Sequence, residues 1–121
     1  LDKLGLAPER VFKTLIASLD GKSLAVAVVP VAAQLNMKRL ARAAGVKKAA
    51  MADPAEVERV TGYVLGGVSP LGQKKRLPTF IDVSAQPLST MFVSAGRRGL
   101  EIELAPGDLA ALTGGVFAEL V

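Results

Sequence analysis

A lysine inside a predicted strand is the first residue whose type and position suggest chemistry. The segment Val11–Leu19 is rich in apolar and β-branched residues, which favours a strand, and Lys13 interrupts its apolar pattern. Alternation places Lys13 on the face opposite Phe12 and Thr14. Lys13 is then either an edge-strand charge that opposes aggregation or a fixed cation that binds a phosphate or an ester carbonyl.

A glycine-rich segment, Gly62 to Gly72, is the second candidate. It has four glycines in eleven residues, which let the backbone approach a ligand and turn its N–H groups toward it. It is not a P-loop, because no Gly-Lys-Ser/Thr follows, and it lacks the G-x-G-x-x-G pattern of dinucleotide sites. We expect either a plain surface loop or a ligand-binding loop, and its length favours the second. The run Lys74-Lys75-Arg76 adds positive charge directly after it.

The third candidate, Ser94-Ala95-Gly96-Arg97-Arg98-Gly99, connects two predicted strands. It is either a solvated hairpin turn or one wall of a pocket. In the second case Ser94 and the Gly96 amide face the ligand, and Arg97 and Arg98 bind phosphate at the rim.

The composition excludes several classes of enzyme. The chain has 121 residues, no cysteine and no histidine, so a Ser-His-Asp triad, a thiol nucleophile and a His- or Cys-ligated metal are ruled out. No pair of carboxylates suggests glycosidase chemistry. We expect neither a metal nor a cofactor. The net charge of +4 modestly favours anionic partners, and the absence of cysteine is typical of the cytoplasm.

The elements that position these segments indicate a single α+β domain, because strands and helices do not alternate regularly. Asn36 and Asp53 are predicted N-caps, and Gly45 and Gly62 predicted helix ends. Lys38, Arg39 and Arg42 lie on the first of the long helices, where we expect a solvated face. Helices are predicted at a short N-terminal turn ending at Gly5 and over 37–44, 54–61 and 106–113. Strands are predicted over 11–19, 24–29, 46–52, 79–83, 91–94, 100–104 and 116–121, with a hairpin turn at Asp20-Gly21.

Together, three segments resemble the YbaK/EbsC family of aminoacyl-tRNA deacylases, which is related to the editing domain of bacterial prolyl-tRNA synthetase. They are Val11-Phe12-Lys13-Thr14-Leu15, the run from Thr61 to Gly72, and Val93-Ser94-Ala95-Gly96-Arg97-Arg98-Gly99-Leu100-Glu101. Each motif alone is weak, but their order and intervals are specific. Within the family, the sequence is most similar to the Cys-tRNA(Pro) deacylase branch.

The resemblance implies a mixed, barrel-like sheet with flanking helices over residues 1–121, a domain that lacks about 30 N-terminal residues usual in the family. It also implies hydrolysis of the ester between a wrong amino acid and the 3′ adenosine of tRNA. Lys13 takes the place of the family's essential lysine. The implied substrate-binding residues are Phe12, Thr14, Gly66, Gly67, Val68, Ser69, Pro70, Gly72, Ser94, Ala95 and Gly96. The basic residues expected to contact tRNA phosphates are Lys74, Lys75, Arg76, Arg97 and Arg98.

The resemblance favours Cys-tRNA(Pro) as substrate, with the substrate's own thiol assisting hydrolysis. Two alternatives remain open at the level of sequence. One is an Ala-tRNA(Pro) deacylase, which has no substrate thiol to use, and the other is a non-catalytic module that binds tRNA or a synthetase. The expected partners are the acceptor end of tRNA and prolyl-tRNA synthetase.

Overall fold

The fold is built around a long antiparallel hairpin. The computed structural model describes residues 8–62, 69–71, 77–96 and 100–121. Strand β1 (Phe12–Leu19) pairs with β2 (Ser23–Pro30) from Phe12↔Pro30 to Leu19↔Ser23. The turn between them has positive φ at Asp20 (53°) and Gly21 (67°), as a type I′ turn requires.

Three short strands extend this hairpin into a five-stranded mixed sheet of order β3-β1-β2-β4-β7. β3 (Ala49–Met51) is antiparallel to β1. β4 (Thr79–Asp82) is parallel to β2, and β7 (Val116–Ala118) is parallel to β4. The α+β class and the mixed sheet are therefore confirmed, while the paired strands of the described residues form an open sheet rather than a closed barrel.

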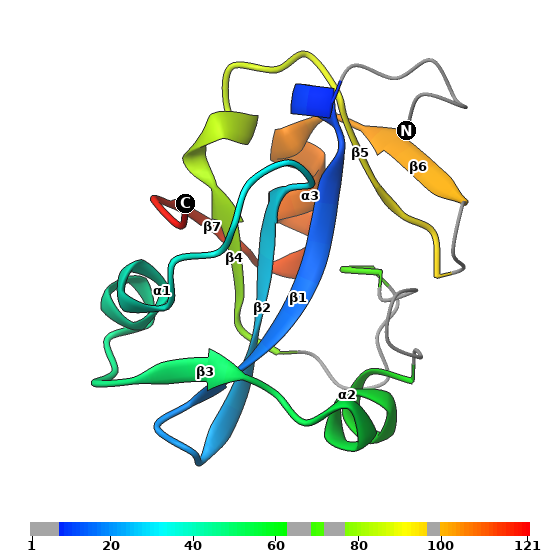
Figure 1. Ribbon diagram of the computed structural model, residues 1–121. Helices are drawn as coiled ribbons and strands as arrows, with labels where there is room; N and C mark the ends of the chain where they lie inside the picture. The colour runs from blue at the N-terminus through cyan, green and yellow to red at the C-terminus, as the bar shows by residue number, and fades with distance from the viewer. Residues whose placement is uncertain (1–7, 63–68, 72–76, 97–99) are drawn as a thin grey trace.

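A second hairpin stands beside β1 (Figure 1). Its strands are β5 (Met91–Ser94) and β6 (Glu101–Leu104), which pair from Met91↔Leu104 to Ser94↔Glu101. A single parallel bridge, Val11↔Phe92, joins it to the start of β1. Arg10 reinforces this junction, because its guanidinium lies 5.1 Å from the Phe92 ring centroid and 3.0 Å from a Glu103 carboxylate oxygen.

The helices begin and end at the residues that local signals predict. In α1 (Met37–Ala44), the Asn36 side chain accepts a hydrogen bond from Arg39 N, and Gly45 closes the helix with a φ of 72°. In α2 (Pro54–Thr61), Asp53 accepts from Ala55 N. α3 (Pro106–Thr113) begins with proline and precedes Gly114. None of these helices is long and apolar enough to cross a membrane.

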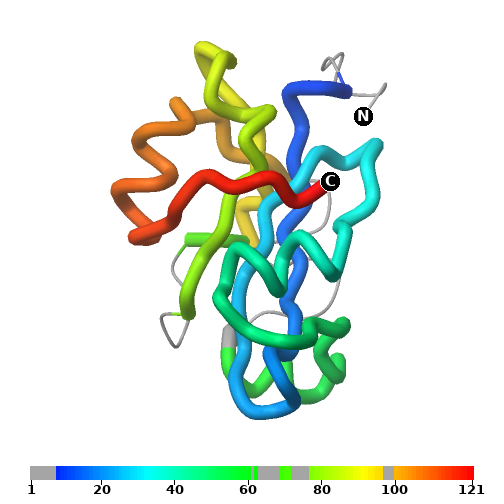
Figure 2. The backbone as a smooth tube through the Cα atoms, turned by 90° about the vertical axis from the view of Figure 1, so that its left-hand side faces the viewer, coloured from blue at the N-terminus to red at the C-terminus, as the bar shows by residue number. Residues whose placement is uncertain are grey.

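The sheet separates two hydrophobic clusters. Phe12, Ile16 and Val28 face one cluster, which contains Leu109 of α3 and Val57 of α2. The alternate strand residues face the other cluster, which contains Leu40 and Ala41 of α1. Figure 2 shows α1 and α3 on opposite sides of the sheet. The side chains of β1 therefore divide between an α1 side and an α3 side.

Most of the predicted strands are confirmed, and two are shorter than expected. The strand predicted over 46–52 contains only three paired residues, and so does the one predicted over 116–121. Both are edge strands, where pairing on one side alone limits the length of the ladder. The predicted N-terminal turn ending at Gly5 lies outside the described residues.

Candidate functional site

The edge of β1 that faces away from β2 is paired only at its two ends. Val31 N donates to Val11 O, so the odd-numbered residues of β1 exchange main-chain hydrogen bonds with β2. Ala52 N donates to Ile16 O, which shows that the even-numbered residues turn toward the opposite edge. β3 occupies that edge beyond Ile16 and β5 occupies it at Val11. Between them, the Thr14 N–H and C=O have no partner strand within the part of the chain that the structure describes.

Lys13 projects from this strand on the α1 side of the sheet, as alternation predicts. Its partner in β2, Val29, and its same-face neighbours Leu15 and Ala17 all belong to the α1-side cluster. The Lys13 side chain is half-buried, and no carboxylate lies within ion-pair distance of it among residues 8–62, 69–71, 77–96 and 100–121. A half-buried ammonium without a carboxylate partner can bind an anion or polarise a carbonyl.

Thr14 projects from the other side of the same strand. Its Oγ1 is buried and has no hydrogen-bond partner in the described structure. A buried hydroxyl without a partner costs about 1–3 kcal/mol, so its retention suggests that a ligand group satisfies it. Phe12, on the same face, is 1% exposed and packs in the α3-side cluster, where it fixes the position of the strand.

Ser94, Ala95 and Gly96 follow β5 at the far end of the second hairpin. Gly96 has a φ of 96°, a conformation that favours glycine. Its N–H donates to Ser94 Oγ at 3.2 Å, and Ala95 N donates to Leu100 O. The Gly96 amide is thus engaged within the turn. Because Ser94 Oγ is the acceptor there, its own O–H remains available as a donor to a substrate.

The register relates this serine to Lys13. The bridge aligns Phe92 with Val11 in parallel, and Ser94 and Lys13 each follow two residues later in their own strands. Beyond the bridge β5 separates from β1 (Figure 1). Lys13 and Ser94 therefore lie where the two strands are no longer paired.

Part of the glycine-rich segment is described. Ser69 is 2% exposed, and its Oγ accepts from Leu71 N at 3.2 Å. Pro70 is buried, and Leu71 packs against the α3-side cluster, which also contains Met91 and Val93 of β5. This segment is therefore anchored in the core on the side to which Thr14 points.

Several predicted site residues lie outside the described residues, so their positions are not stated. They are Gly66, Gly67, Val68 and Gly72 of the glycine-rich loop, and the basic residues Lys74, Lys75, Arg76, Arg97 and Arg98. Within the described part of the chain, no group of three His, Cys, Asp or Glu side chains could hold a metal ion.

Sequence reasoning did not select Glu101 as a site residue, although the structure places it beside one. Glu101 is the cross-strand partner of Ser94, and burial raises the pKa of its carboxyl above the usual value. A carboxyl with a raised pKa next to a hydroxyl can exchange protons nearer neutral pH. The sequence carries no direct signal for this pair, because the pairing of Ser94 with Glu101 follows from the register of β5 and β6.

Comparison with known proteins identifies relatives that match most of the chain. A family model described as the aminoacyl-tRNA editing domain matches residues 1–112. A protein of Enterococcus faecalis, EbsC, named as a Cys-tRNA(Pro)/Cys-tRNA(Cys) deacylase, is 44% identical over 98% of this chain and 73% of its own length. A proline--tRNA ligase of Moorella thermoacetica is 31% identical over 82% of this chain but only 17% of the ligase.

A solved structure supports the same relationship. It is described as a trans-editing enzyme for prolyl-tRNA synthetase and has 26% sequence identity to this chain. The match has a TM-score of 0.88 and covers 98% of this chain and 74% of the other. Sequence and fold therefore agree on aminoacyl-tRNA deacylase activity, and the chain belongs to the aminoacyl-tRNA editing domain family.

Proposed function

We propose that this domain hydrolyses Cys-tRNA(Pro) in trans, releasing cysteine from tRNA that has been charged incorrectly. The main support is the 44% identity to a relative named as a Cys-tRNA(Pro)/Cys-tRNA(Cys) deacylase, over nearly the full chain. The site has a matching chemical character. It offers a cation, hydroxyls and main-chain groups, and the sequence contains no cysteine or histidine to act as the nucleophile.

An aminoacyl ester is already activated, so its hydrolysis depends mainly on positioning and on stabilising the developing oxyanion. In the proposed reaction the substrate's thiol sulfur bonds to its own carbonyl carbon. The bond from that carbon to the ribose oxygen breaks, and the thiol proton passes to the ribose oxygen. Water then opens the cyclic thioester and yields free cysteine.

Each described residue of the edge has a role in this proposal. Lys13 stabilises the oxyanion or holds the phosphate of the terminal nucleotide. Thr14 offers the substrate its side-chain Oγ1 and the main-chain N–H and C=O of the unpaired edge. Ser94 donates its O–H to the substrate. The resemblance to the family assigns substrate binding to the glycine-rich segment from Gly66 to Gly72 as well.

The experiment that tests the thiol is a comparison of substrates that differ by one atom. The initial rate of deacylation is measured on Cys-tRNA(Pro) and Ser-tRNA(Pro), with Ala-tRNA(Pro) as the substrate that has neither group. We expect Cys-tRNA(Pro) to be hydrolysed at least about 100-fold faster than the other two, in the range of one lost catalytic group. Equal rates on the cysteine and serine esters would refute thiol assistance, and faster turnover of the alanine ester would identify an Ala-tRNA(Pro) deacylase.

We further propose that the domain acts in the cytoplasm together with prolyl-tRNA synthetase. The similarity of this chain to a short part of a proline--tRNA ligase supports the link, because the matching segment belongs to a synthetase chain in that relative. Adding purified synthetase should lower the KM for Cys-tRNA(Pro). An unchanged KM at saturating synthetase would contradict the partnership.

A further inference from the structure

Helix α1 presents only cations to solvent. Lys38, Arg39 and Arg42 are exposed, and the helix contains no acidic residue. At 3.6 residues per turn these three positions fall within an arc of about 100°. That arc lies opposite the buried Leu40 and Ala41. The packing of α1 on the sheet thus directs all three charges outward.

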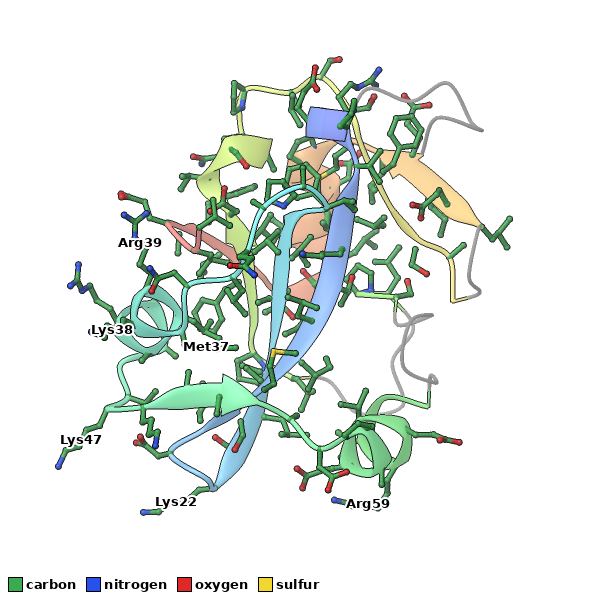
Figure 3. The ribbon with its side chains drawn as sticks, in the orientation of Figure 1. Lys22, Met37, Lys38, Arg39, Lys47 and Arg59 are labelled. Atoms are coloured by element: carbon green, nitrogen blue, oxygen red, sulfur yellow. The ribbon has the colours of Figure 1, made fainter. Side chains whose placement is uncertain are left out.

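Three further lysines extend this surface. Lys47 and Lys48 follow α1, and Lys22 lies in the turn between β1 and β2, all of them exposed. Asp20 N donates to Lys48 O, and the Asp20 carboxylate accepts from Lys48 N at 2.8 Å, which ties the turn to this segment. In Figure 3, the labelled Lys22, Lys38, Arg39 and Lys47 project from one side of the molecule. We call this surface the basic face: Lys22, Lys38, Arg39, Arg42, Lys47 and Lys48.

The charges of the basic face are not neutralised by ion pairs. In the described part of the chain the ion pairs are Arg10–Glu103 and Arg59–Glu56, and neither involves the basic face. Clustered like charges repel one another and raise the local concentration of anions. The sequence favoured an ordinary solvated face on α1, whereas the structure adds the neighbouring lysines and gives the cluster no ion pair with any other described residue.

A cavity of about 290 Å³ lies within this surface. Arg39 and Arg42 line it together with Ala43, Ala118 and Glu119. The Arg39 guanidinium also donates to the Val121 carbonyl, which holds this side chain beside the C-terminal segment. Guanidinium groups suit phosphate oxygens in both charge and geometry, and two of them outweigh the single Glu119 carboxylate.

We propose that the basic face binds the phosphate backbone of tRNA at a distance from the reacting ester. This inference rests on the proposed function for the identity of the polyanion. Lys13 and α1 belong to the same side of the sheet, so a polynucleotide whose 3′ end reaches Lys13 can continue over α1. The bound group is a backbone phosphate, and the cavity lined by Arg39 and Arg42 receives one of them.

The test measures binding of uncharged tRNA(Pro) by fluorescence anisotropy over a range of salt concentrations. The double variant Lys38→Gln/Arg42→Gln is compared with Arg59→Glu, which changes the net charge by the same amount on exposed α2. We expect the double variant to bind several-fold more weakly and to lower the salt slope of log K by about 2, or about 1 per lost phosphate contact. Arg59→Glu should retain the parental slope.

A variant that removes a negative charge from the cavity gives a second test, because it should change tRNA affinity in the opposite direction. Glu119→Gln removes the carboxylate from the cavity and should tighten tRNA binding. Equal effects of the double variant and Arg59→Glu would overturn the proposal, because only net charge would then matter. An unchanged tRNA affinity in the double variant would also overturn the proposal. If the same variant bound an acidic protein more weakly, the basic face would be a protein-binding surface instead.

The two proposals can fail separately. Binding of uncharged tRNA does not depend on hydrolysis, so it tests the basic face even if the domain does not hydrolyse Cys-tRNA(Pro). Where hydrolysis is observed, the double variant should raise the KM for full-length Cys-tRNA(Pro) with little change in kcat. A loss of kcat with unchanged tRNA binding would place these residues in the ester site and contradict the proposal.

Discussion

Lys13 combines three properties that ordinary surface lysines do not share. It lies within a strand, it is half-buried, and it has no carboxylate partner in the described structure. Replacing it should therefore affect the reaction far more than the fold.

We expect Lys13→Ala to lower kcat/KM for deacylation by at least about 100-fold, the usual loss when one stabilising group is removed from an oxyanion. The free energy of unfolding should change by less than about 1 kcal/mol, since the ammonium makes no ion pair whose loss would cost stability. Urea unfolding and initial rates on Cys-tRNA(Pro) measure the two quantities. Lys13→Arg, which keeps the charge, is the matched control. Full activity of Lys13→Ala, or its unfolding, would contradict the prediction.

The substitution Thr14→Val distinguishes a role of the Thr14 hydroxyl in substrate binding from a role in the stability of the fold. Valine has nearly the shape of threonine and removes only the buried Oγ1 that lacks a partner. Deleting a hydroxyl of this kind should leave the fold equally stable or more stable, by up to about 1 kcal/mol. If that hydroxyl contacts the substrate, the KM for deacylation should rise at the same time. A destabilised variant with an unchanged KM would show that Thr14 has a structural role only.

Asp82 joins two elements through one buried carboxylate. It is 2% exposed, and its oxygens accept hydrogen bonds from Ser84 N at the end of β4 and from Leu120 N after β7. Asp82→Ala leaves the buried Leu120 N–H without an acceptor and should cost about 2–3 kcal/mol. Thermal unfolding measures this cost, with the exposed Asp108→Ala on α3 as control. A similar change in both variants would refute the structural role of Asp82.

Local elements could be predicted from the sequence wherever the signal lies within a few residues. Asn36, Asp53 and Gly45 gave the bounds of α1 and α2, because caps satisfy the backbone of their own helix. The order of the strands could not be predicted, since the parallel β2–β4 and β4–β7 pairs join distant parts of the chain.

The candidate site, like the strand order, could be predicted from the sequence only where the signal is local. Lys13 and Ser94 are predicted site residues on the basis of their motifs and of the resemblance to a family. The unpaired edge at Thr14 depends on where β3 and β5 end along β1, and that is a property of tertiary structure. Glu101 was missed because its proximity to Ser94 follows from a strand register rather than from sequence spacing.

For the molecule as a whole, charge is the property that connects the separate segments. The net charge is only +4, so attraction to tRNA must come from local clusters. The described cluster is the basic face, and the sequence adds Lys74, Lys75, Arg76, Arg97 and Arg98.

We expect the affinity for tRNA to fall steeply with salt, because each phosphate contact releases a counterion. Anisotropy titrations between about 50 and 200 mM KCl span the range in which this dependence is largest. Neutralising Arg97 and Arg98 together should make the salt slope shallower. An affinity that does not change with salt would rule out a surface that follows phosphates.

The unpaired edge of β1 has a consequence for hydrogen exchange. The amides of Lys13 and Leu15 donate into the β2 ladder, while the amide of Thr14 between them turns to the unpaired edge. In heavy water the Thr14 amide should exchange faster than both of its neighbours, which makes a single backbone position a reporter inside an otherwise protected strand. A ligand bound along the edge would slow that one amide and leave the flanking two unchanged. Exchange at Thr14 thus offers a way to observe substrate binding without following the reaction.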